Sequence, residues 1–487
     1  MIFLKSKKFY ITTTLPYVNA DPHIGFALEI IQADVMARYY KSLGYDVFFN
    51  TGVDEHGLKI FRKAKDSNID TKEYCDIYAK KFEDLKNSLN LSYNNFIRTT
   101  DKHHIKAAQE FWKLCEKNGD IYKKNYKTKY CVGCESEKTE SELVNNKCPI
   151  HPNLELETIE EENYFFRYSK YQKDLLNFYE KNKNFVIPES RLNEIKEFTK
   201  RGLKDFSISR LKEKMPWGIE VPSDEKHVMY VWFDALVNYI SCLGWPVDNK
   251  KFKDFWPGLQ MAGKDNLRQQ TSMWQAMLMS AGLKNSKQVF IHGFITSNGQ
   301  KMSKSLGNVV NPIDLVKKYG TDAVRYYLLR EISSVEDGDF TYEKFEQRYN
   351  SDLAGGVGNL VARVLGISKN IEIKNIESTK NTGEKIKEIK ENYEKQIKEF
   401  KFNEAISSIW ELISYCDKYI NEEKLWETPS TSSGQVKKQK VISDLFFTLK
   451  EIAELLNPFL PETSEKIKTA IINKKSEVLF PRISIDT

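Results

Sequence analysis

The sequence predicts a multidomain α/β protein, in which a doubly wound parallel-sheet domain is interrupted by an insertion and followed by an all-α helical bundle. Strand-like and helical patterns alternate near the N-terminus and again before residue 311. A Cys-containing, charged segment separates these two parts, and helical periodicity then continues almost to the end of the chain. A chain of 487 residues, at roughly 100 to 200 residues per domain, has room for several such units.

Composition excludes several classes of protein. Hydrophobic residues make up 40% of the chain and charged residues 29%, as in folded rather than disordered proteins. Lys and Arg number 74 against 68 Asp and Glu, so nonspecific attraction to nucleic acid is not the main function. No stretch approaches the ~18 apolar residues of a membrane span, and lysines interrupt the N-terminus where a signal peptide needs an apolar core. We therefore expect a cytoplasmic protein without a membrane segment.

The opening unit has a strand–helix–strand pattern. Residues 9–14 are strand-like, a polar loop follows, and apolar residues at helical spacing predict a helix over 23–41. A second strand, over 45–49, leads into the polar loop 51–57, and a crossover of this length predicts that the two strands are parallel. The ligand site of such a domain lies at the carboxyl ends of its strands, where both polar loops emerge.

The rest of the chain divides by pattern. Residues 118–226 form the predicted insertion, and strand patterns at 227–233, 259–263 and 288–295 are expected to complete the same sheet. Helical periodicity after Asn311 predicts a bundle, with the polar and basic run 428–440 as a solvated loop between two of its helices. The expected domains are the first half of the sheet domain at 1–117, the insertion at 118–226, the second half at 227–310, a junction at 311–350 and the bundle at 351–487.

The sequence PHIGF, at 22–26, places an imidazole and a small residue in the first turn of a helix. A helix N-terminus presents unpaired N–H groups and the positive end of its dipole to a phosphate. Gly25 allows a nucleotide to approach the backbone, and His23 can donate to phosphate oxygens. Taken alone, this pattern also fits a capping or surface histidine.

The sequence KMSKS, at 301–305, follows Asn298 and Gly299, a pair that favours a tight turn. Lys301 and Lys304 flank a small hydroxyl residue, and such a loop can close over a polyphosphate as negative charge develops on it. The alternative is a solvated basic loop.

Four residues have the spacing of a structural zinc site. Cys131 and Cys134 form a Cys-x-x-Cys pair, and Cys148 and His151 form a Cys-x-x-His pair some fourteen residues later. Four protein ligands leave no open position for water, so we expect one Zn²⁺ with a structural role. The alternative is a group of buried thiols without metal.

Taken together, these motifs resemble the methionyl-tRNA synthetase family of class I aminoacyl-tRNA synthetases, in its bacterial form with a single zinc knuckle. The resemblance extends nearly end to end and is densest in TTTLPYVNADPHIG, TGVDEHG, YVWFDA, GKD, KMSKSLGN and GNLVARV. It implies a Rossmann-type catalytic domain split by a zinc-binding connective insertion, followed by an all-α helical-bundle domain that binds the anticodon.

The resemblance also implies a reaction. The carboxylate of L-methionine attacks the α-phosphate of ATP, which gives methionyl adenylate and pyrophosphate, and the 3′ end of tRNA(Met) then accepts the methionyl group. No covalent nucleophile on the enzyme is needed, because positioning and charge stabilisation supply most of the catalysis. Mg²⁺ is expected to accompany ATP, and the protein is expected to be a monomer because the chain ends soon after the bundle.

Site residues follow from the same resemblance. The residues implied in catalysis are His23, Lys301 and Lys304. The residues implied in ATP binding are His23, Gly25, Phe26, Gly263, Asp265, His292, Lys301 and Lys304. The residues implied in methionine binding are Leu15, Tyr17, Asp54, Trp232, Ala235, Tyr239, Asn266 and Gln270. The residues implied in anticodon reading are Asn359, Arg363 and Trp426.

Physical chemistry supports several of these assignments and leaves alternatives to others. The Asp54 carboxylate, at a strand end, can pair with an ammonium group. Asp265 can accept from two ribose hydroxyls, or it can cap a helix instead. The rings of Trp232 and Tyr239 suit a thioether, but both residues also fit an ordinary core. Asn, Arg and Trp are apt types for single-stranded bases, although each is more often structural.

Three positions depart from the family pattern. Phe26 stands where the family has a second histidine, and Asn266 and Gln270 stand where it usually has Ile and His. Other functions remain open on this basis: another class I synthetase, a catalytically weakened tRNA-binding homologue, or another nucleotidyl-transfer enzyme. No large editing insertion interrupts the chain, which favours methionine over valine, isoleucine or leucine as the substrate.

Overall fold

A six-stranded sheet in the computed structural model has the strand order β3-β2-β1-β12-β13-β7. The pairings β1–β2, β2–β3, β1–β12 and β13–β7 are parallel. The strand order reverses beside β1, as in a doubly wound domain, so the predicted α/β fold is confirmed. The strands are β1 (Lys8–Thr12), β2 (Asp46–Val53), β3 (Asn95–Arg98), β7 (Val186–Ile187), β12 (Leu259–Gly263) and β13 (Gln288–His292).

The structure describes residues 7–134, 136–138, 142–302, 307–369, 371, 376–425, 427, 431–475 and 477–484. The chain forms two compact units. The first unit comprises Met1–Pro22, Tyr40–Lys86 and Ser92–Ile291, and the second comprises His23–Tyr39, Asn87–Leu91 and His292–Thr487. Among the described residues, no helix is long and apolar enough to cross a membrane.

Aromatic side chains build the core of the first unit. The rings of Phe111 and Trp274 stack at 5.5 Å, and those of Trp112 and Phe233 meet edge-on at 5.2 Å. Aromatic side chains bury a large apolar area, so their packing holds the helices that carry them against the core. The helices of this unit are α2 (Leu58–Asp66), α3 (Thr71–Glu83), α5 (Lys102–Lys117), α6 (Gln172–Lys181), α7 (Glu189–Lys200), α8 (Val231–Ala235), α9 (Asn238–Ser241), α10 (Asn249–Phe255) and α11 (Trp274–Ser280). The helices α1 (Ile24–Ser42) and α4 (Leu85–Ser88) cross from one unit into the other.

Two strand predictions need correction. β2 continues to Val53, four residues past its predicted end, because 50–53 pair with β3. The pattern at 227–233 is not part of the parallel sheet, so its placement there was wrong. Its first half ends β11 (Asp224–Met229), which pairs antiparallel with β9 (Ser209–Leu211) and β10 (Glu220–Val221), and its second half is α8. The alternation of apolar and polar residues predicts a strand but does not specify which strand it pairs with, so the prediction placed this strand in the wrong sheet.

The segment predicted as an insertion has a sheet of its own. Its strands are ordered β5-β4-β6-β8, and the pairs are antiparallel. The same segment also contributes β7, whose two residues pair with Val289 and Phe290 in the six-stranded sheet. The strands are β4 (Ile121–Cys131), β5 (Ser136–Lys138), β6 (Glu157–Phe166) and β8 (Phe206–Ser207).

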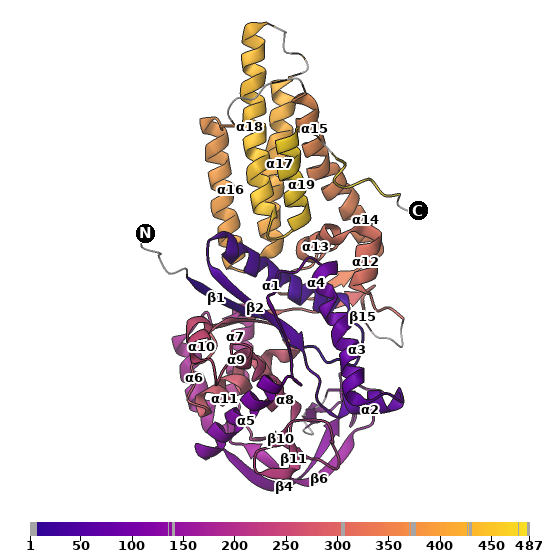
Figure 1. The fold of residues 1–487 in the computed structure, drawn as a ribbon, viewed down its shortest axis with the longest axis vertical. Helices are drawn as coiled ribbons and strands as arrows, with labels where there is room; N and C mark the ends of the chain where they lie inside the picture. Colours follow the sequence, from indigo (N-terminus) through magenta and orange to yellow (C-terminus); the bar gives the residue numbers. More distant parts are fainter. Residues whose placement is uncertain are drawn as a thin grey trace. The chain divides into compact units, whose positions relative to one another are not determined.

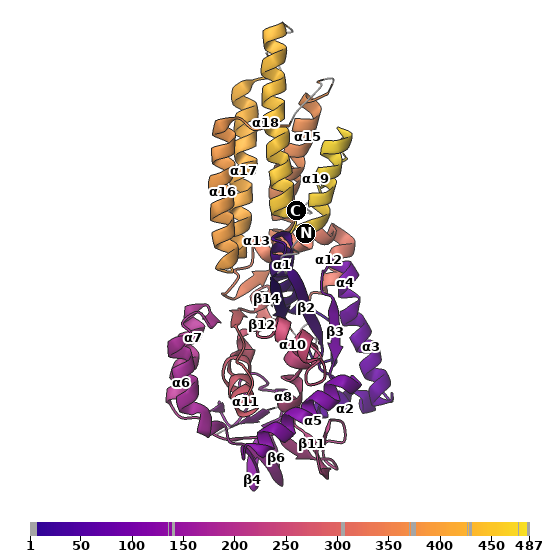
Figure 2. The same cartoon turned by 60° about the vertical axis from the view of Figure 1, so that its left-hand side comes forward.

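The predicted all-α domain is confirmed in the second unit, where long helices lie side by side (Figures 1 and 2). Buried residues such as Ile409 on α17 and Leu449 on α18 recur at helical spacing, so each helix turns an apolar face to its neighbours. These helices are α15 (Asn359–Ile367), α16 (Lys380–Lys398), α17 (Phe402–Glu423), α18 (Ser432–Leu456) and α19 (Pro461–Asn473). They are preceded by α12 (Pro312–Tyr319), α13 (Thr321–Arg330), α14 (Tyr342–Arg348) and the π-helical turn Tyr349–Gly358.

The solvated loop predicted at 428–440 is wrong for most of its length. Residues 428–430 lie outside the described residues, but α18 begins at Ser432. The Thr431 hydroxyl caps the helix by accepting from the Gly434 N–H at 3.3 Å. The buried residues of α18 lie mostly at 441–456, and packing of this part stabilises the whole helix despite the low helix propensity of Ser and Gly at its start.

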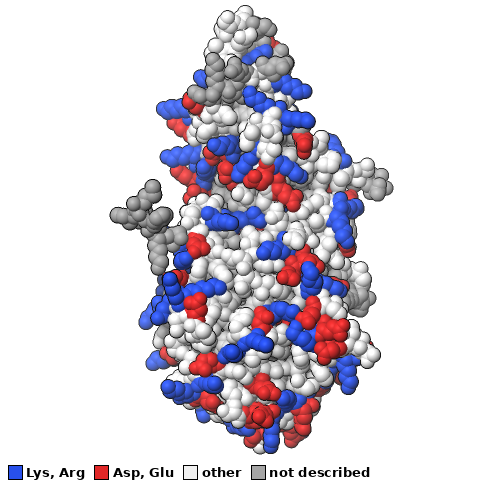
Figure 3. Space-filling view, in the orientation of Figure 1, with Lys and Arg blue, Asp and Glu red and all other residues white. Residues whose placement is uncertain are grey.

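Basic and acidic side chains are intermingled on the face shown in Figure 3. In the bundle, for example, Lys385 pairs with Glu388 at 3.0 Å and Lys390 with Glu451 at 2.8 Å. This mixture agrees with the small net charge of +6. Any nucleic acid held by such a surface has to be recognised through specific contacts rather than bulk attraction.

Candidate active site and metal centre

The loops after β1 and β2 are joined at the carboxyl ends of these strands. Tyr17 and Asp54 form an isolated parallel bridge. The Val18 N–H donates to the Asp54 carbonyl at 3.2 Å, and the Asp54 N–H donates to the Pro16 carbonyl at 2.9 Å. The sequence placed the ligand site at these strand ends, and the structure brings the two loops together there.

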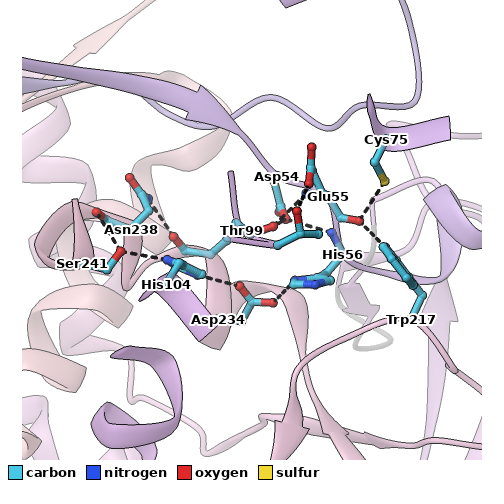
Figure 4. Close-up of polar contacts among 12 residues, drawn as sticks. Asp54, Glu55, His56, Cys75, Thr99, His104, Trp217, Asp234, Asn238 and Ser241 are labelled. Atoms are coloured by element: carbon cyan, nitrogen blue, oxygen red, sulfur yellow. Dashed lines mark hydrogen bonds and ion pairs between the residues drawn. The ribbon is translucent and has the colours of Figure 1, made fainter. Parts of the chain in front are cut away.

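The Asp54 carboxylate is 3% exposed. Its Oδ1 accepts from the His56 backbone N–H at 3.3 Å and from the Thr99 hydroxyl at 3.4 Å (Figure 4). Both contacts are long, so they orient the carboxylate more than they neutralise it. A buried carboxylate held in this way is suited to pair with a cation.

Aromatic residues surround Tyr17, the bridge partner of Asp54. Tyr17 and Trp232 lie against a small cluster formed by Tyr130, Tyr230 and Val231, while Leu15 packs against the main core. The half-buried Trp232 has an indole N–H with no acceptor among the described residues. Such a donor can hydrogen-bond to a bound ligand.

Tyr239 is both core and hydrogen-bonded. It is 2% exposed, and its hydroxyl accepts from Gln270 Nε2 at 2.6 Å. Gln270 Oε1 in turn accepts from Gln260 Nε2 at 3.1 Å. Gln270 therefore holds the Tyr239 hydroxyl, and Gln260 holds Gln270. Tyr239 can thus be a core residue and a wall of the methionine site at the same time. Ala235, on α8, is 7% exposed.

The end of β12 carries three of the predicted site residues. Gly263 precedes a 3-10 turn, Lys264–Asn266, and no side chain caps that turn. Asp265 lies within this turn, whose N-cap position is Gly263. Asp265 is exposed, and its Oδ1 accepts from Asn266 Nδ2 at 3.1 Å. Asn266 thus contacts Asp265, whereas Gln270 is buried.

Arg210, on β9, lies beside the cluster of Tyr130, Tyr230 and Val231, and it was not predicted from the sequence as a site residue. It is 4% exposed, with its guanidinium 4.5 Å from the centre of the Tyr230 ring and 5.3 Å from that of Tyr130. A buried cation over two rings is favourable and adds positive charge near Tyr17 and Trp232. The sequence carries little signal for it, because β9 has only the three residues Ser209, Arg210 and Leu211.

In the second unit, His23 lies immediately before α1 and folds back over its first turn. Its Nδ1 accepts from the Gly25 backbone N–H at 3.0 Å. This hydrogen bond leaves the proton on Nε2, which can then donate to a ligand. Phe26 is half-buried, and its N–H donates to the His23 carbonyl at 3.1 Å.

His292 contacts the same helix one turn further on. It is 5% exposed, with its Nε2 2.9 Å from Glu29 Oε2 and its Nδ1 2.7 Å from the Gly293 carbonyl. Both ring nitrogens face acceptors, so the ring ties the end of β13 to α1. The backbone leaves β13 at Gly293, where an added Cβ would lie 2.2 Å from the Glu336 carbonyl oxygen.

The tight turn predicted before KMSKS is present. Asn298 and Gly299 have φ values of 53° and 72°, the positive values of a type I′ hairpin turn between β14 (Ile295–Ser297) and β15 (Gln300–Lys301). β14 also pairs with β16 (Gly338–Phe340), so the expected strand 288–295 is divided between two sheets. Lys301 is exposed, and its carbonyl accepts from Asn308 Nδ2 at 3.3 Å. Lys304 lies outside the described residues.

The four predicted metal ligands come together. One donor atom from each of Cys131, Cys134, Cys148 and His151 lies within 4.8 Å of the others. Cys134 Sγ is 3.5 Å from Cys148 Sγ and 3.2 Å from His151 Nδ1. Gly133 makes room for the imidazole, since an added Cβ would lie 2.6 Å from His151 Cγ. This set of soft and borderline donors can hold a metal ion.

Asn359 and Arg363 lie one turn apart on α15. The Arg363 guanidinium donates to Asp417 Oδ1 at 2.5 Å and to Asn421 Oδ1 at 2.8 Å, both on α17. These contacts fix the orientation of the guanidinium, while Asn359 is exposed. The third predicted anticodon residue, Trp426, lies outside the described residues.

Comparisons with known proteins agree with this arrangement. The family model described as tRNA synthetases class I (M) matches residues 9–155 and 134–365. The model described as the anticodon-binding domain of tRNA ligase matches residues 382–484. Asn359 and Arg363 fall within the span of the first model.

Individual relatives are similar over most of the chain. A methionine–tRNA ligase of Thermotoga maritima is 42% identical over 472 residues, which are 94% of this chain and 74% of that protein. One of Clostridium acetobutylicum is 42% identical over 99% of this chain and 79% of that protein. The structure of Mycobacterium tuberculosis methionyl-tRNA synthetase in complex with methionyl-adenylate has a TM-score of 0.91 and 36% identity, and covers 95% of this chain and 93% of that chain. This chain therefore belongs to the methionyl-tRNA synthetase family of class I tRNA synthetases.

Proposed function

We propose that this chain acts as a methionine–tRNA ligase: it activates methionine with ATP, releases pyrophosphate, and transfers the methionyl group to the 3′ end of tRNA(Met). The observation that carries the proposal is the bridge between Tyr17 and Asp54, in which Tyr17 packs against the same aromatic cluster as Trp232. It joins a buried carboxylate to aromatic walls at the carboxyl ends of two parallel strands, which is where a doubly wound domain binds its ligands. A charged ammonium and an apolar thioether side chain match these two surfaces.

In this proposal Asp54 pairs with the methionine ammonium, and the aromatic walls accept the side chain. Sulfur packs favourably against ring edges, so Tyr17, Trp232 and Tyr239 suit a thioether. Gln270 stabilises the Tyr239 hydroxyl with an amide in place of the imidazole usual in the family. Because an amide does not titrate, this contact is independent of pH near neutrality. The proposed methionine site consists of Leu15, Tyr17, Asp54, Trp232, Ala235, Tyr239, Asn266 and Gln270.

ATP is proposed to bind at the start of α1. The Nε2 proton of His23 and the N–H groups of the first helical turn are donors for phosphate oxygens. Lys301 and Lys304 stabilise charge on the leaving pyrophosphate, with Mg²⁺ accompanying the nucleotide. Asp265, exposed after β12, has the acceptors that ribose hydroxyls need. Gly25, Phe26, Gly263 and His292 complete the proposed ATP site.

The metal is proposed to be Zn²⁺, held by Cys131, Cys134, Cys148 and His151. Four protein ligands close a tetrahedral site, so the ion stabilises the knuckle and takes no part in the reaction. The knuckle is tied to α2, because Lys59 Nζ donates to the Gly133 carbonyl at 3.2 Å. Lys59 Nζ also lies 5.9 Å from the centre of the Tyr17 ring. Lys59 therefore connects the metal-binding knuckle to Tyr17.

For tRNA, we propose that Asn359, Arg363 and Trp426 contact the anticodon. Guanidinium and amide groups can hydrogen-bond to the edges of splayed bases, and an indole can stack on them. The proposed division of the chain is a catalytic domain at 1–117 and 227–310, a connective insertion at 118–226, a junction at 311–350 and the anticodon domain at 351–487. The protein is proposed to act as a monomer in the cytoplasm.

Amino-acid-dependent exchange of labelled pyrophosphate into ATP tests the first step. The exchange should require methionine and should be absent or far slower with the other amino acids, including leucine, isoleucine and valine. Exchange with another amino acid alone would support a different class I synthetase. No exchange with any amino acid, from folded protein, would favour a catalytically weakened tRNA-binding homologue.

A further inference from the structure

We propose that Asp234, which the sequence did not single out, is a positioning residue of the methionine site. Its buried carboxylate holds two histidines and thereby fixes the loop that carries Asp54 against the helix that carries Trp232. This inference rests on the proposed function and adds a residue to it that touches no substrate. The evidence is a chain of hydrogen bonds inside the first unit (Figure 4).

The Asp234 carboxylate is 0% exposed and contacts a histidine with each oxygen. His56 Nδ1 lies 2.8 Å from Oδ2, and His104 Nε2 lies 3.2 Å from Oδ1. The two rings approach from opposite sides (Figure 4). On its far side, His104 Nδ1 lies 2.8 Å from the Ser241 hydroxyl. Burial by itself raises the pKa of Asp234, but the two imidazoles, His56 above all, lower it overall, so the group is a carboxylate.

An ionised carboxylate only accepts hydrogen bonds, and this fixes the direction of both bonds to Asp234. His56 must carry its proton on Nδ1 and His104 on Nε2. Charge-assisted bonds of this kind are stronger than neutral ones and cost most when a buried partner is lost.

His56 links Asp234 to Asp54: its ring contacts the Asp234 carboxylate, and its backbone N–H contacts the Asp54 carboxylate. The His56 N–H donates to Asp54 Oδ1 at 3.3 Å. On the other side, Asp234 lies on α8 between Trp232 and Ala235. One carboxylate therefore connects the part of the pocket proposed for the ammonium to the part proposed for the side chain.

A second, neutral tie joins the same two walls. Asn50 Nδ2, on β2, is 3.4 Å from Asn238 Oδ1, and Asn238 Nδ2 donates to the Ala235 carbonyl at 2.7 Å. Phe233 also packs edge-on against Phe111 at 5.9 Å. These contacts keep α8 in place without the carboxylate. Loss of the Asp234 charge is therefore expected to alter the pocket while the fold remains.

The test compares Asp234→Asn with wild type in methionine-dependent pyrophosphate exchange. An amide has one acceptor, and its NH₂ would face the proton of the second imidazole. The KM for methionine should rise roughly 10- to 100-fold, as expected when a charge-assisted hydrogen bond is lost, with kcat and the KM for ATP nearly unchanged. A residue that only supports the fold would instead lower the active fraction and leave the KM for methionine as it was.

Asp120→Asn is the matched control. Asp120 is another fully buried carboxylate of the first unit, and it accepts from Lys170 at 2.7 Å and from Ser280 at 2.8 Å. It has no hydrogen bond to the loop of Asp54 or to α8 among those of the described residues. Its replacement should lower the melting temperature without raising the KM for methionine.

A pair of His56 variants tests the hydrogen bond itself. His56→Asn keeps an N–H donor near the position of Nδ1, whereas His56→Leu removes it. The asparagine variant should keep a KM for methionine close to wild type, and the leucine variant should match Asp234→Asn. This pair also carries the test if Asp234→Asn does not fold.

The outcomes are distinguishable. If wild type shows no methionine-dependent exchange, the proposed function fails and this inference falls with it. If wild type is active but Asp234→Asn and Asp120→Asn have the same KM for methionine, the proposed function stands and the positioning role is wrong. Equal KM values for His56→Asn and His56→Leu would also overturn it.

Discussion

The imidazole of His23 rests on Gly25, with Nδ1 3.0 Å from the Gly25 backbone nitrogen that donates to it. A Cβ at position 25 would lie 2.8 Å from His23 Cε1 and 2.9 Å from Nδ1. The absence of a side chain at Gly25 therefore makes room for the His23 ring, and not only for a bound nucleotide. The backbone at Gly25 is helical, so a left-handed conformation plays no part in this requirement.

Replacing Gly25 with Ala should separate activity from stability. The methyl group would displace the His23 ring from the Gly25 N–H, the donor that sets its tautomer. We therefore expect adenylate formation to fall on the order of 10- to 100-fold. Alanine has the higher helix propensity, so the melting temperature should stay the same or rise. Steady-state exchange kinetics and a melting curve on the same sample measure both. An active Gly25→Ala enzyme would show that the ring position is not needed.

Lys304→Ala should reduce adenylate formation while methionine binding stays nearly intact, because the ammonium is proposed to act on charge that develops at the pyrophosphate. A loss of roughly 10- to 1000-fold in kcat is typical for one such group. Lys301→Ala should act in the same direction. Lys317→Ala, an exposed lysine on α12, is the control and should have no effect. An unchanged exchange rate for Lys304→Ala would remove that residue from the mechanism.

Arg363→Ala should impair transfer to tRNA and leave pyrophosphate exchange unchanged. Asp417 and Asn421 hold its guanidinium in one orientation, so its removal takes away a preformed donor. We expect charging to fall on the order of tenfold or more, with a similar loss for Trp426→Ala, since stacking on one base contributes roughly 1–3 kcal/mol. Lys418→Ala, on the same helix as Asp417 and 75% exposed, is the control. Full charging by both variants would refute the anticodon assignment.

Metal analysis should find about one zinc per chain in protein prepared without added metal. Cys148→Ser should lose the ion, because a hydroxyl does not replace a thiolate ligand. Cys416→Ala, which removes a buried thiol of α17 in the second unit, should keep it. Zinc at background level in wild type, or at full occupancy in Cys148→Ser, would contradict the assignment.

Acid should destabilise the connective segment through Asp224. Burial by itself raises the pKa of this carboxyl, and hydrogen bonds from Lys123 and Tyr164 more than offset it, so its pKa lies well below the ordinary range. The folded pKa is thus below the unfolded value of about 3.9, and the stabilisation is present above that pH and lost as pH falls towards the folded pKa.

Asp224→Asn should therefore lower the melting temperature at pH 7, by an amount equivalent to roughly 1–2 kcal/mol. The difference from wild type should shrink as the pH falls below about 4, because the carboxyl is then protonated in the unfolded chain before it is protonated in the folded protein. Glu160→Gln, which removes a carboxylate that is 71% exposed, should change little at any pH. A difference that stays constant with pH would exclude the carboxylate as its source.

Local patterns predicted a large part of this structure. The strand patterns of β1, β2 and β12, the turn at Asn298 and Gly299, and the grouping of Cys131 with His151 each depend on residues close together in the sequence. For these features the chemistry of a short segment is sufficient, because periodicity, turn preference and ligand spacing are local properties.

Features that depend on distant partners were missed. His56 and His104 lie 178 and 130 residues from Asp234, and no local pattern marks three polar residues as members of one buried network. The sequence also placed β11 in the wrong sheet, since alternation does not name a partner strand. The early start of α18 was missed because Ser and Gly favour loops, and only packing further along the helix overrides them.

The most direct test of the central claim is charging of tRNA(Met) by the wild-type protein with labelled methionine, ATP and Mg²⁺. The account predicts that acid-precipitable methionine accumulates on the 3′ end of this tRNA, needs ATP, and is far lower when methionine is replaced by another amino acid or when the anticodon is changed. Methionyl transfer that is absent, or equally fast to any tRNA, from protein that is folded and carries its zinc, would contradict it.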